Sequence, residues 1–329
     1  MLRYYIFLSL GKHKKALIVL TILVIASIST VFVVLELTRS EKRLILATTT
    51  STYDSGLLDY LLPKFEKKEG IQVDVLSVGT GQALELGRQG NADVLLVHSR
   101  PREDLFINNN YGIHRTCLMY NDFIIIGPHN DPAQINRTTI TTAMERLKLA
   151  GESGNSTFYS RGDGSGTNSK ELILWNSIGF TPNAANTSWY FETGEGMGTT
   201  LIITNQDPKG YTLIDRGTWL FQKDSAENME MLVEGDTILL NPYGAILINP
   251  DIYPHIQYNK ALKFIAFMVS EYGQELIGNY TVNNQVLFHP CFGKCNDVYN
   301  CTTTAQEIAF WSQYNGGYTG GYTATSSAA

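Results

Sequence analysis

Apolar and polar residues follow two alternating patterns along the chain from residue 44 onward. Short apolar runs typical of buried strands occur at 44–48, 72–78 and 93–97. Segments whose apolar residues recur at helical spacing occur at 55–68, 81–89 and 102–109. Because strands and helices that alternate in this order form a mostly parallel sheet with helices on both faces, the pattern predicts an α/β fold.

A long apolar stretch at 117–128 interrupts this alternation, and we interpret it as a strand that crosses into a second lobe. Beyond it, helices are expected at 139–150 and 167–178, and a third helix is opened by residues 193–198 and ends at about residue 205. Strands are expected at 189–192 and 211–214. A second apolar stretch at 237–248 predicts the return crossing, and an amphipathic helix at 258–270 follows it. The chain is therefore divided into lobe I at 44–126 and 237–313, lobe II at 127–236, and a low-complexity Gly/Tyr/Ser tail at 314–329.

The first 43 residues differ from the rest of the chain. Three lysines precede an apolar run at 16–34 that is long enough to span a membrane, which predicts a signal peptide or an N-terminal membrane anchor at 1–43. The lack of a clear small-residue cleavage site before Arg39 favours the anchor. We therefore expect an exported protein, either anchored at the outer face of the cytoplasmic membrane or periplasmic or extracellular after cleavage.

The four cysteines fit an oxidising compartment. Cys117, Cys291, Cys295 and Cys301 can form two disulfides in three ways, and the sequence does not select among them. The Cys-x3-Cys spacing has no matching Cys-x2-Cys pair, so a zinc site is not favoured. We expect no metal and no cofactor.

Charge limits the class of partner. The 329 residues include 25 basic and 31 acidic ones, and removing the first 43 leaves 18 against 29, a formal charge of about −11. Nucleic acids and anionic membrane surfaces bind through many Lys and Arg contacts, so an acidic surface excludes them as partners. A small anion remains compatible, because an enclosed pocket can hold it with one arginine, backbone N–H groups and helix N-termini.

Residues 160–167, Ser-Arg-Gly-Asp-Gly-Ser-Gly-Thr, combine the groups that such a pocket needs. Arg161 carries a planar fork of donors that can bind two oxygens at once. Three glycines allow successive N–H groups to face one concavity, and Ser165 and Thr167 add hydroxyls where a helix begins. A glycine-rich turn followed by a helix cap is the plain alternative for this stretch.

Two strand-to-helix junctions in the first lobe have a related composition. A run of hydroxyl residues at 48–52 follows the first strand, and Gly-Thr-Gly at 79–81 follows the second. Ligands of open α/β sheets lie at the carboxyl ends of strands, which is where both junctions fall. Each junction alone is a weak signal, since hydroxyls also cap helices.

Several motifs together resemble one known family. They are Ala-Thr-Thr-Thr-Ser (47–51), Asp-Ser-Gly-Leu-Leu-Asp-Tyr-Leu-Leu-Pro-Lys-Phe-Glu (54–66), Val-Gly-Thr-Gly-Gln-Ala-Leu (78–84), Ala-Asp-Val-Leu-Leu-Val-His (92–98), Met-Tyr-Asn-Asp-Phe (119–123), the 160–167 loop and Gly-Glu-Gly-Met-Gly (194–198). In this order they look like the tungstate-binding proteins of ABC transporters. The resemblance implies a type II periplasmic-binding-protein fold, whose two α/β lobes are joined by two crossing strands and enclose a tetrahedral oxyanion.

The resemblance also implies a set of ligand-binding residues and a partner. Carried over by position, the oxyanion site would consist of Thr50, Ser51, Thr52, Thr80, Gly81, Arg161, Ser165, Gly166 and Thr167. The protein would capture tungstate, with molybdate not distinguished from it, and deliver it to an ABC transporter permease. We expect a monomer.

The residues support a fully ionised anion over a protonated one. Hydrogen phosphate carries a proton, so a selective pocket for it gains from a carboxylate acceptor, and the loop Val97-His98-Ser99-Arg100 offers none. The tungstate affinity should therefore be flat over roughly pH 6.5 to 9. Asp163, inside the 160–167 loop, keeps a phosphate-type site as an alternative, and a sulfate-type site, which like tungstate needs donors only, also stays open. His98 is interpreted as a hydrogen-bonded structural residue.

Enzyme motifs are missing from the sequence. It contains no Gly-x-Ser-x-Gly elbow, no His-Glu-x-x-His and no Gly-x4-Gly-Lys-Ser/Thr loop, so we do not expect an enzyme. A membrane-anchored sensor or adhesion module built on the same two lobes remains the alternative from another functional class.

Overall fold

The protein is described here by a computed structural model, which covers residues 17, 20–27, 43–294, 301 and 303–320, without the side chain of Ser51. It forms two compact units, Met1–Arg43 and Leu44–Ala329, which are considered separately. In the first unit, residues 17 and 20–27 are helical, and the rest of the predicted signal or anchor lies outside the described residues. Across the described part of the chain, no helix is both long and apolar enough to span a membrane.

Lobe I is built from three strands, with helices between and after them, followed much later in the chain by two more helices. Its elements are β1 Arg43–Thr49, α2 Thr50–Asp54, α3 Leu57–Glu69, β2 Gln72–Val78, α4 Thr80–Arg88, β3 Val94–Val97, α5 Arg100–Asn108, α10 Tyr258–Met268 and α11 Glu271–Gly278.

The helix predicted at 55–68 is confirmed as α3, and the structure adds a short helix, α2, that the sequence does not predict. The hydroxyl run is itself helical as α2, and Gly56 then takes a left-handed conformation with φ 75° before α3 begins. The Ser55 hydroxyl donates to the carbonyl of Thr52 at 2.7 Å, which closes the end of α2.

Lobe II repeats the alternation of strand and helix. Its elements are α6 Ile140–Glu152, β5 Thr157–Ser160, α7 Gly166–Ser177, β6 Tyr190–Glu192, α8 Met197–Asn205, β7 Gly210–Asp215, α9 Arg216–Gln222, the short 3-10 helix Lys223–Ser225 and β8 Met229–Val233. The 3-10 helix Thr237–Leu239 leads back toward lobe I.

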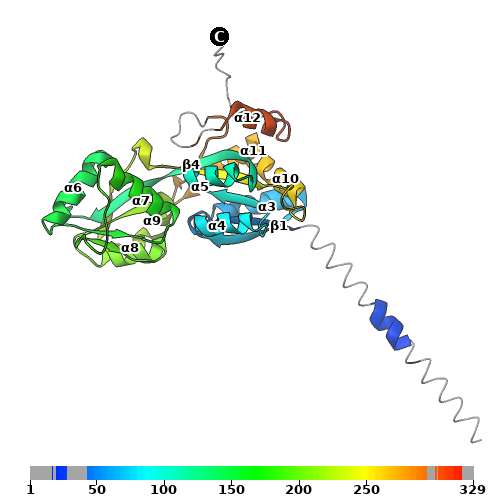
Figure 1. Ribbon diagram of the computed structural model, residues 1–329, viewed down its shortest axis with the longest axis horizontal. Helices are drawn as coiled ribbons and strands as arrows, with labels where there is room; N and C mark the ends of the chain where they lie inside the picture. Colours follow the sequence, from blue (N-terminus) through cyan, green and yellow to red (C-terminus); the bar gives the residue numbers. More distant parts are fainter. Residues whose placement is uncertain (1–16, 18–19, 28–42, 295–300, 302, 321–329) are drawn as a thin grey trace, which may run out of the picture. The chain divides into compact units, whose positions relative to one another are not determined.

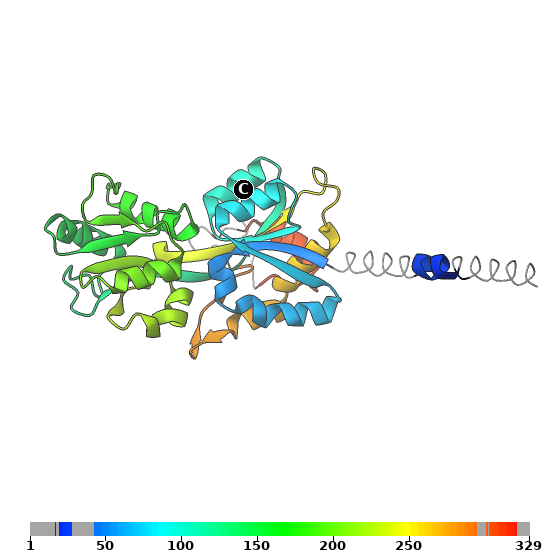
Figure 2. The ribbon, with the colours of Figure 1, turned by 90° about the horizontal axis from the view of Figure 1, so that it is seen from below.

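Two long antiparallel strands join the lobes (Figures 1 and 2). They are β4, Gly112–Pro128, and β9, Leu240–Ile248, which pair over much of the length of β9. Both lie where the sequence predicts crossing strands, although β4 begins five residues earlier than expected.

The two lobes share one strand order. In lobe I the order is β2-β1-β3 followed by β9 and β4, and in lobe II it is β6-β5-β7 followed by β4 and β8. The pairs β1–β3, β5–β6 and β5–β7 are parallel, whereas the crossing strands pair antiparallel with their neighbours. In each lobe the first two strands in sequence therefore end beside each other at one edge of the sheet.

Alternate residues of the strands bury two different faces, as expected for a sheet covered on both sides. In β3, Val94 and Leu96 join the core cluster that includes α3, α10 and α11, whereas Leu95 and Val97 join the cluster that includes α4 and α5. In β4, Phe123 and Ile125 likewise pack with α6 and α7 on one face. Helices thus hold each strand from both sides, which fixes the position of the loops at its carboxyl end.

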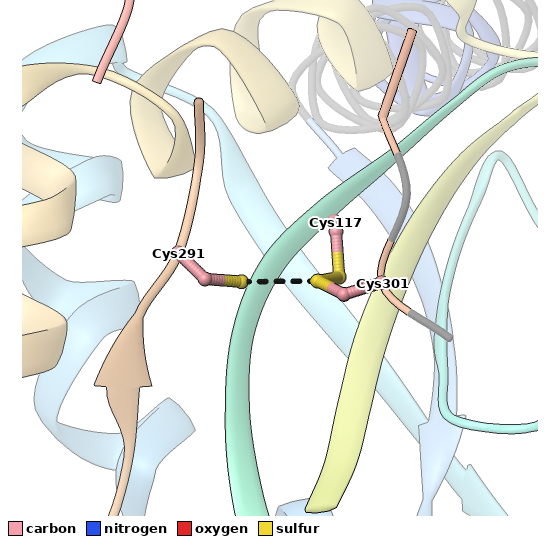
Figure 3. Close-up of side chains that lie close together, drawn as sticks. All are labelled: Cys117, Cys291 and Cys301. Carbon is pink, nitrogen blue, oxygen red and sulfur yellow. Dashed lines mark hydrogen bonds between the residues drawn. A yellow bond between two sulfur atoms is a disulfide. The ribbon is translucent and has the colours of Figure 1, made fainter. Parts of the chain in front are cut away.

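A disulfide attaches the C-terminal segment to the crossing strand β4 (Figure 3). Cys117 of β4 is bonded to Cys301, which precedes α12, Ala305–Ser312. The sulfur of Cys291 lies 3.3 Å from that of Cys301, just after the short strand β12, His289–Pro290, which pairs with β4. Cys295 lies outside the described residues. Two short strands, β10 Thr281–Val282 and β11 Gln285–Val286, form a separate hairpin.

Candidate oxyanion site

Four strand-to-helix junctions occupy equivalent places in the two lobes. In lobe I they follow β1 and β2 and lead into α2 and α4, and in lobe II they follow β5 and β6 and lead into α7 and α8. The sequence predicts the first three as ligand loops. Their N–H groups at the start of each helix have no intrahelical acceptor, which suits an anion.

The loop after β5 is held in shape by its own polar groups. Gly162 and Gly164 take left-handed conformations with φ 60° and 68°. Ser165 caps α7, accepting from the N–H of Asn168 at 3.3 Å, and this leaves its hydroxyl proton available for another acceptor. Asn168 in turn accepts from the N–H of Gly164 at 3.1 Å.

A buried carboxylate, that of Glu171, holds the start of this loop in place through hydrogen bonds. Glu171 of α7 accepts from the indole N–H of Trp175 at 3.0 Å and from the Tyr190 hydroxyl at 2.8 Å, and it also accepts from the Ser160 hydroxyl. Burial raises the pKa of the Glu171 carboxyl above its ordinary value. These bonds tie the end of β5 to both α7 and β6, so the loop starts from a rigid base.

Arg161 is the cation of this loop and is almost wholly buried, with 9% of its surface exposed. Its Nη2 donates to the Asp163 carboxylate at 2.5 Å, and the other oxygen of that carboxylate accepts from the N–H of Ser165 at 3.0 Å. Its Nε has no hydrogen-bond partner among the described residues. A buried guanidinium donor without an acceptor is costly, and this indicates a place for an oxygen ligand.

Thr80 carries a second such donor, on the opposite lobe. It is the first residue of α4, it is 1% exposed, and its hydroxyl has no partner within the described part of the chain. Gly79, which precedes it, provides no side-chain cap for α4. The junction after β2 therefore contains a buried hydroxyl at an uncapped helix N-terminus.

The predicted residues of the junction after β1, Thr50, Ser51 and Thr52, differ in exposure. Thr50 is exposed and lines a cleft of about 650 Å³. Thr52 is buried, and its hydroxyl lies 2.7 Å from the hydroxyl of Thr49. The side chain of Ser51 lies outside the described residues.

The cleft brings together parts of both lobes. Thr50 and Asp54 line it from lobe I, and Arg161 and residues 196–198 line it from lobe II. Six other predicted residues are not part of its wall: Thr52, Thr80, Ser165, Gly166 and Thr167 are buried, and Gly81 is exposed. Burial raises the pKa of the Asp54 carboxyl, which is the acidic group that lobe I presents to the cleft.

His98 lies at the end of β3 and packs against the start of α7. A Cβ on Gly166 would lie 2.5 Å from the His98 ring, so the two lobes touch closely there. Its Nδ1 lies 2.9 Å from the Asn241 side chain on β9, and burial lowers the pKa of the imidazole to about 4. The hydrogen bond expected for His98 is present, and its structural role stays a prediction.

Comparisons with known proteins agree with this architecture. The chain matches the PBP superfamily domain over residues 37–272. The tungstate-binding protein TupA of Peptoclostridium acidaminophilum is 46% identical over 245 residues, which cover 74% of this chain and 84% of the relative.

Two solved structures are also similar to this chain. The tungstate-binding protein TupA from Desulfovibrio alaskensis G20 is 41% identical, with a TM-score of 0.67 over 75% of this chain and 98% of its own. The tungstate ABC transporter structure from Geobacter sulfurreducens is 47% identical, with a TM-score of 0.65 over 73% of this chain and 99% of its own. The chain belongs to the TupA family of the PBP superfamily.

The superfamily match includes all four junctions and Cys117, and it ends before the three later cysteines at 291, 295 and 301. Within this TupA-family chain, two features near the junctions escape the sequence reasoning. The first is the fourth junction, Gly196 to Gly198, which is not among the ligand residues predicted from the sequence. It lines the cleft at the N-terminus of α8, where no side chain caps the helix. Its place after the second strand of lobe II, equivalent to 79–81 in lobe I, was the available signal.

The second feature is a pair of additional cations. Lys170 of α7 donates to the carbonyls of Ile238 and Leu240 at 2.7 and 2.9 Å, and burial lowers the pKa of its ammonium to about 8. Arg102 of α5 donates to the carbonyl of Gly164 at 2.8 Å. Arg102 reaches a junction only through the packing of a separate element, and Lys170, which lies in α7 close to the 160–167 loop, finds its partners in a distant segment.

Proposed function

We propose that this protein binds tungstate, or the closely similar molybdate, between its two lobes and delivers it to an ABC transporter permease. The ligand-binding set is Thr50, Ser51, Thr52, Thr80, Gly81, Arg161, Ser165, Gly166 and Thr167, to which we add the N–H groups of the junction at residues 196–198. We keep the lobe boundaries that the sequence predicts, lobe I at 44–126 and 237–313 and lobe II at 127–236, and we propose that the binding step is not enzymatic.

The observation that carries this proposal is a pair of buried donors. The Arg161 Nε and the Thr80 hydroxyl both lack partners among the described residues, and they come from junctions of opposite lobes, after β5 and after β2. An unsatisfied buried donor costs about 1–3 kcal/mol. An oxyanion that accepts from both would recover this cost, whereas an apolar ligand would not.

The cleft composition supports a ligand that is small and anionic. Its lobe II wall combines a guanidinium with an uncapped helix N-terminus, both of which favour negative charge. The names of the TupA relatives give tungstate as their ligand, and we extend that ligand to this chain.

The test is a calorimetric titration of the purified chain with tungstate, molybdate, sulfate, chromate and phosphate. Tungstate and molybdate should bind tightest. Hydrogen phosphate should bind at least about a hundredfold more weakly, which corresponds to about 3 kcal/mol. Small-angle scattering should show a smaller radius of gyration with tungstate, because the donors come from two lobes that would close about β4 and β9.

One observation favours a second ligand class. Asp54 lines the cleft and Asp163 lies beside Arg161, so carboxylate acceptors for a protonated oxyanion are close to the donors. Phosphate binding tighter than tungstate would assign this class, and it should then weaken on Asp163→Asn or Asp54→Asn. Failure of all five anions to bind would reject the oxyanion proposal.

A further inference from the structure

The guanidinium of Arg102 lies between two ligand loops of opposite lobes. Its Nη1 is 3.3 Å from the position that a Cβ on Gly81 would take, in the junction after β2. The same Nη1 donates to the carbonyl of Gly164, in the junction after β5, at 2.8 Å. Arg102 belongs to the first turn of α5 in lobe I, so this bond crosses from one lobe to the other.

This bond fixes the orientation of one peptide group in the 160–167 loop, the peptide between Gly164 and Ser165. In a trans peptide the C=O and the following N–H point in opposite directions. With the Gly164 carbonyl turned toward Arg102, the N–H of Ser165 points to the other side, where it donates to Asp163 beside Arg161. The N–H of Gly164 is held separately by Asn168, so the peptides on both sides of Gly164 are fixed.

Gly164 makes this peptide easy to misplace. Its φ of 68° is a conformation that glycine takes without strain, and glycine can also leave it at little cost. If the peptide rotated, the carbonyl oxygen would replace the Ser165 N–H on the side of Arg161. An oxygen there would repel an anion that the N–H would bind.

We propose that Arg102 is a positioning residue that keeps the Gly164–Ser165 peptide oriented for anion binding, and that it does so only while lobe I lies against lobe II. The inference rests on the proposed oxyanion function and deepens it. Lobe II then completes its cradle when the lobes approach, because the group that orders the loop belongs to the other lobe. Closure and ligand binding are thereby coupled through one side chain.

Three variants test the role. Arg102→Ala removes the bond, and Arg102→Lys keeps the charge but replaces the planar fork by a point donor. The matched control is Arg88→Ala, which removes the same charge from lobe I, where Arg88 pairs with Glu85 within α4. Tungstate affinity is measured by calorimetry at low salt and at about 0.5 M salt, where charge effects between exposed groups are screened.

Arg102→Ala should weaken tungstate binding by about tenfold, and the loss should persist in high salt because it arises from loop geometry. Arg102→Lys should recover part of the affinity, and Arg88→Ala should bind as the unaltered chain does. With saturating tungstate, hydrogen exchange of the peptide that covers residues 162–167 should be faster in Arg102→Ala alone.

Two results would overturn the inference while leaving the proposed function intact. One is an affinity loss that disappears in high salt or is fully restored by lysine, which would make Arg102 a distant charge. The other is unchanged exchange in the 162–167 loop. If the unaltered chain binds no oxyanion, the proposed function fails, whereas unchanged loop exchange in a chain that does bind tungstate overturns only the role of Arg102.

Discussion

The ligand junctions of the two lobes hold equivalent places in the same strand order but contain different chemistry. In lobe II the junction after β5 buries Arg161, with Lys170 in the helix that follows. In lobe I the groups buried at the junctions after β1 and β2 are hydroxyls, those of Thr52 and Thr80. The comparison teaches that topology fixes where a ligand can bind, whereas the side chains divide recognition between charge on one lobe and neutral donors on the other.

This division has a physical rationale. If each lobe buried a cation at the cleft, the two cations would repel each other whenever the lobes approached without a ligand. Neutral hydroxyls add donors at no such cost. The carboxylates near Arg161, Asp163 by direct contact and Asp215 through its field, balance the charge of lobe II.

The largest expected effect is on the charged side. Arg161→Ala should reduce the free energy of tungstate binding by about 2–5 kcal/mol, because the charge pair is buried when the ligand binds. Arg161→Lys should recover only part, since an ammonium cannot bind two oxygens in a plane. Calorimetry gives both values, and unchanged binding in the alanine variant would remove lobe II as the charged partner.

The next effect is a loss of folding stability at low pH, caused by the buried, uncharged His98 of lobe I. His98 has a pKa of about 4 in the folded protein, below its ordinary value of 6.5, so the unfolded chain takes up a proton first as the pH falls. Stability should therefore decrease between about pH 6.5 and 4, by up to about 3 kcal/mol from this group. Urea unfolding across that range measures it. His98→Gln should show a shallower decrease, and an equal slope in both proteins would contradict the assignment.

Thr80 should show opposite effects on stability and on binding. Thr80→Val keeps the shape and removes the unpartnered hydroxyl, so the protein without anion should gain about 1 kcal/mol of stability. Tungstate binding should weaken by about tenfold, because a hydrogen bond to a charged ligand is lost.

Thr48→Val is the matched control for Thr80. The Thr48 hydroxyl is buried in the neighbouring strand but donates to the carbonyl of Leu96 at 2.8 Å. Its loss should lower stability and leave tungstate affinity unchanged. If both valine variants behave alike in thermal unfolding and calorimetry, the hydroxyl of Thr80 has no special place in the site.

The smallest effect is a pH dependence that the sequence alone does not predict. Burial lowers the pKa of Lys170 to about 8, so the ammonium loses its charge as the pH rises through that value. Because the charged form favours a nearby anion, tungstate affinity should fall above pH 8, by less than about tenfold. Lys170→Met should remove the dependence, and a flat profile in the unaltered chain would limit the charge of lobe II to Arg161.

Much of the fold could be predicted because local patterns and burial agree. The alternation of apolar strands with helices placed β1, β2, β3 and both crossing strands within a few residues. The short helix α2 is not predicted, because hydroxyl residues at 50–52 suggest a cap in sequence but form a helix in the structure. Short elements such as α9 and β8 had no distinct period and were not predicted.

The sequence by itself determined the alternation of strands and helices, the three candidate junctions and the candidate cation Arg161, because these depend on short runs of residues whose spacing is local. Only the tertiary structure decided which donors lack partners, that Cys117 pairs with Cys301, that Arg102 reaches the 160–167 loop from α5, and that Lys170 bonds to the carbonyls of Ile238 and Leu240. These contacts join residues far apart in sequence, and they form only when the crossing strands bring the two lobes together. Burial then sets the charge of His98 and Lys170, a property that no local pattern of residues contains.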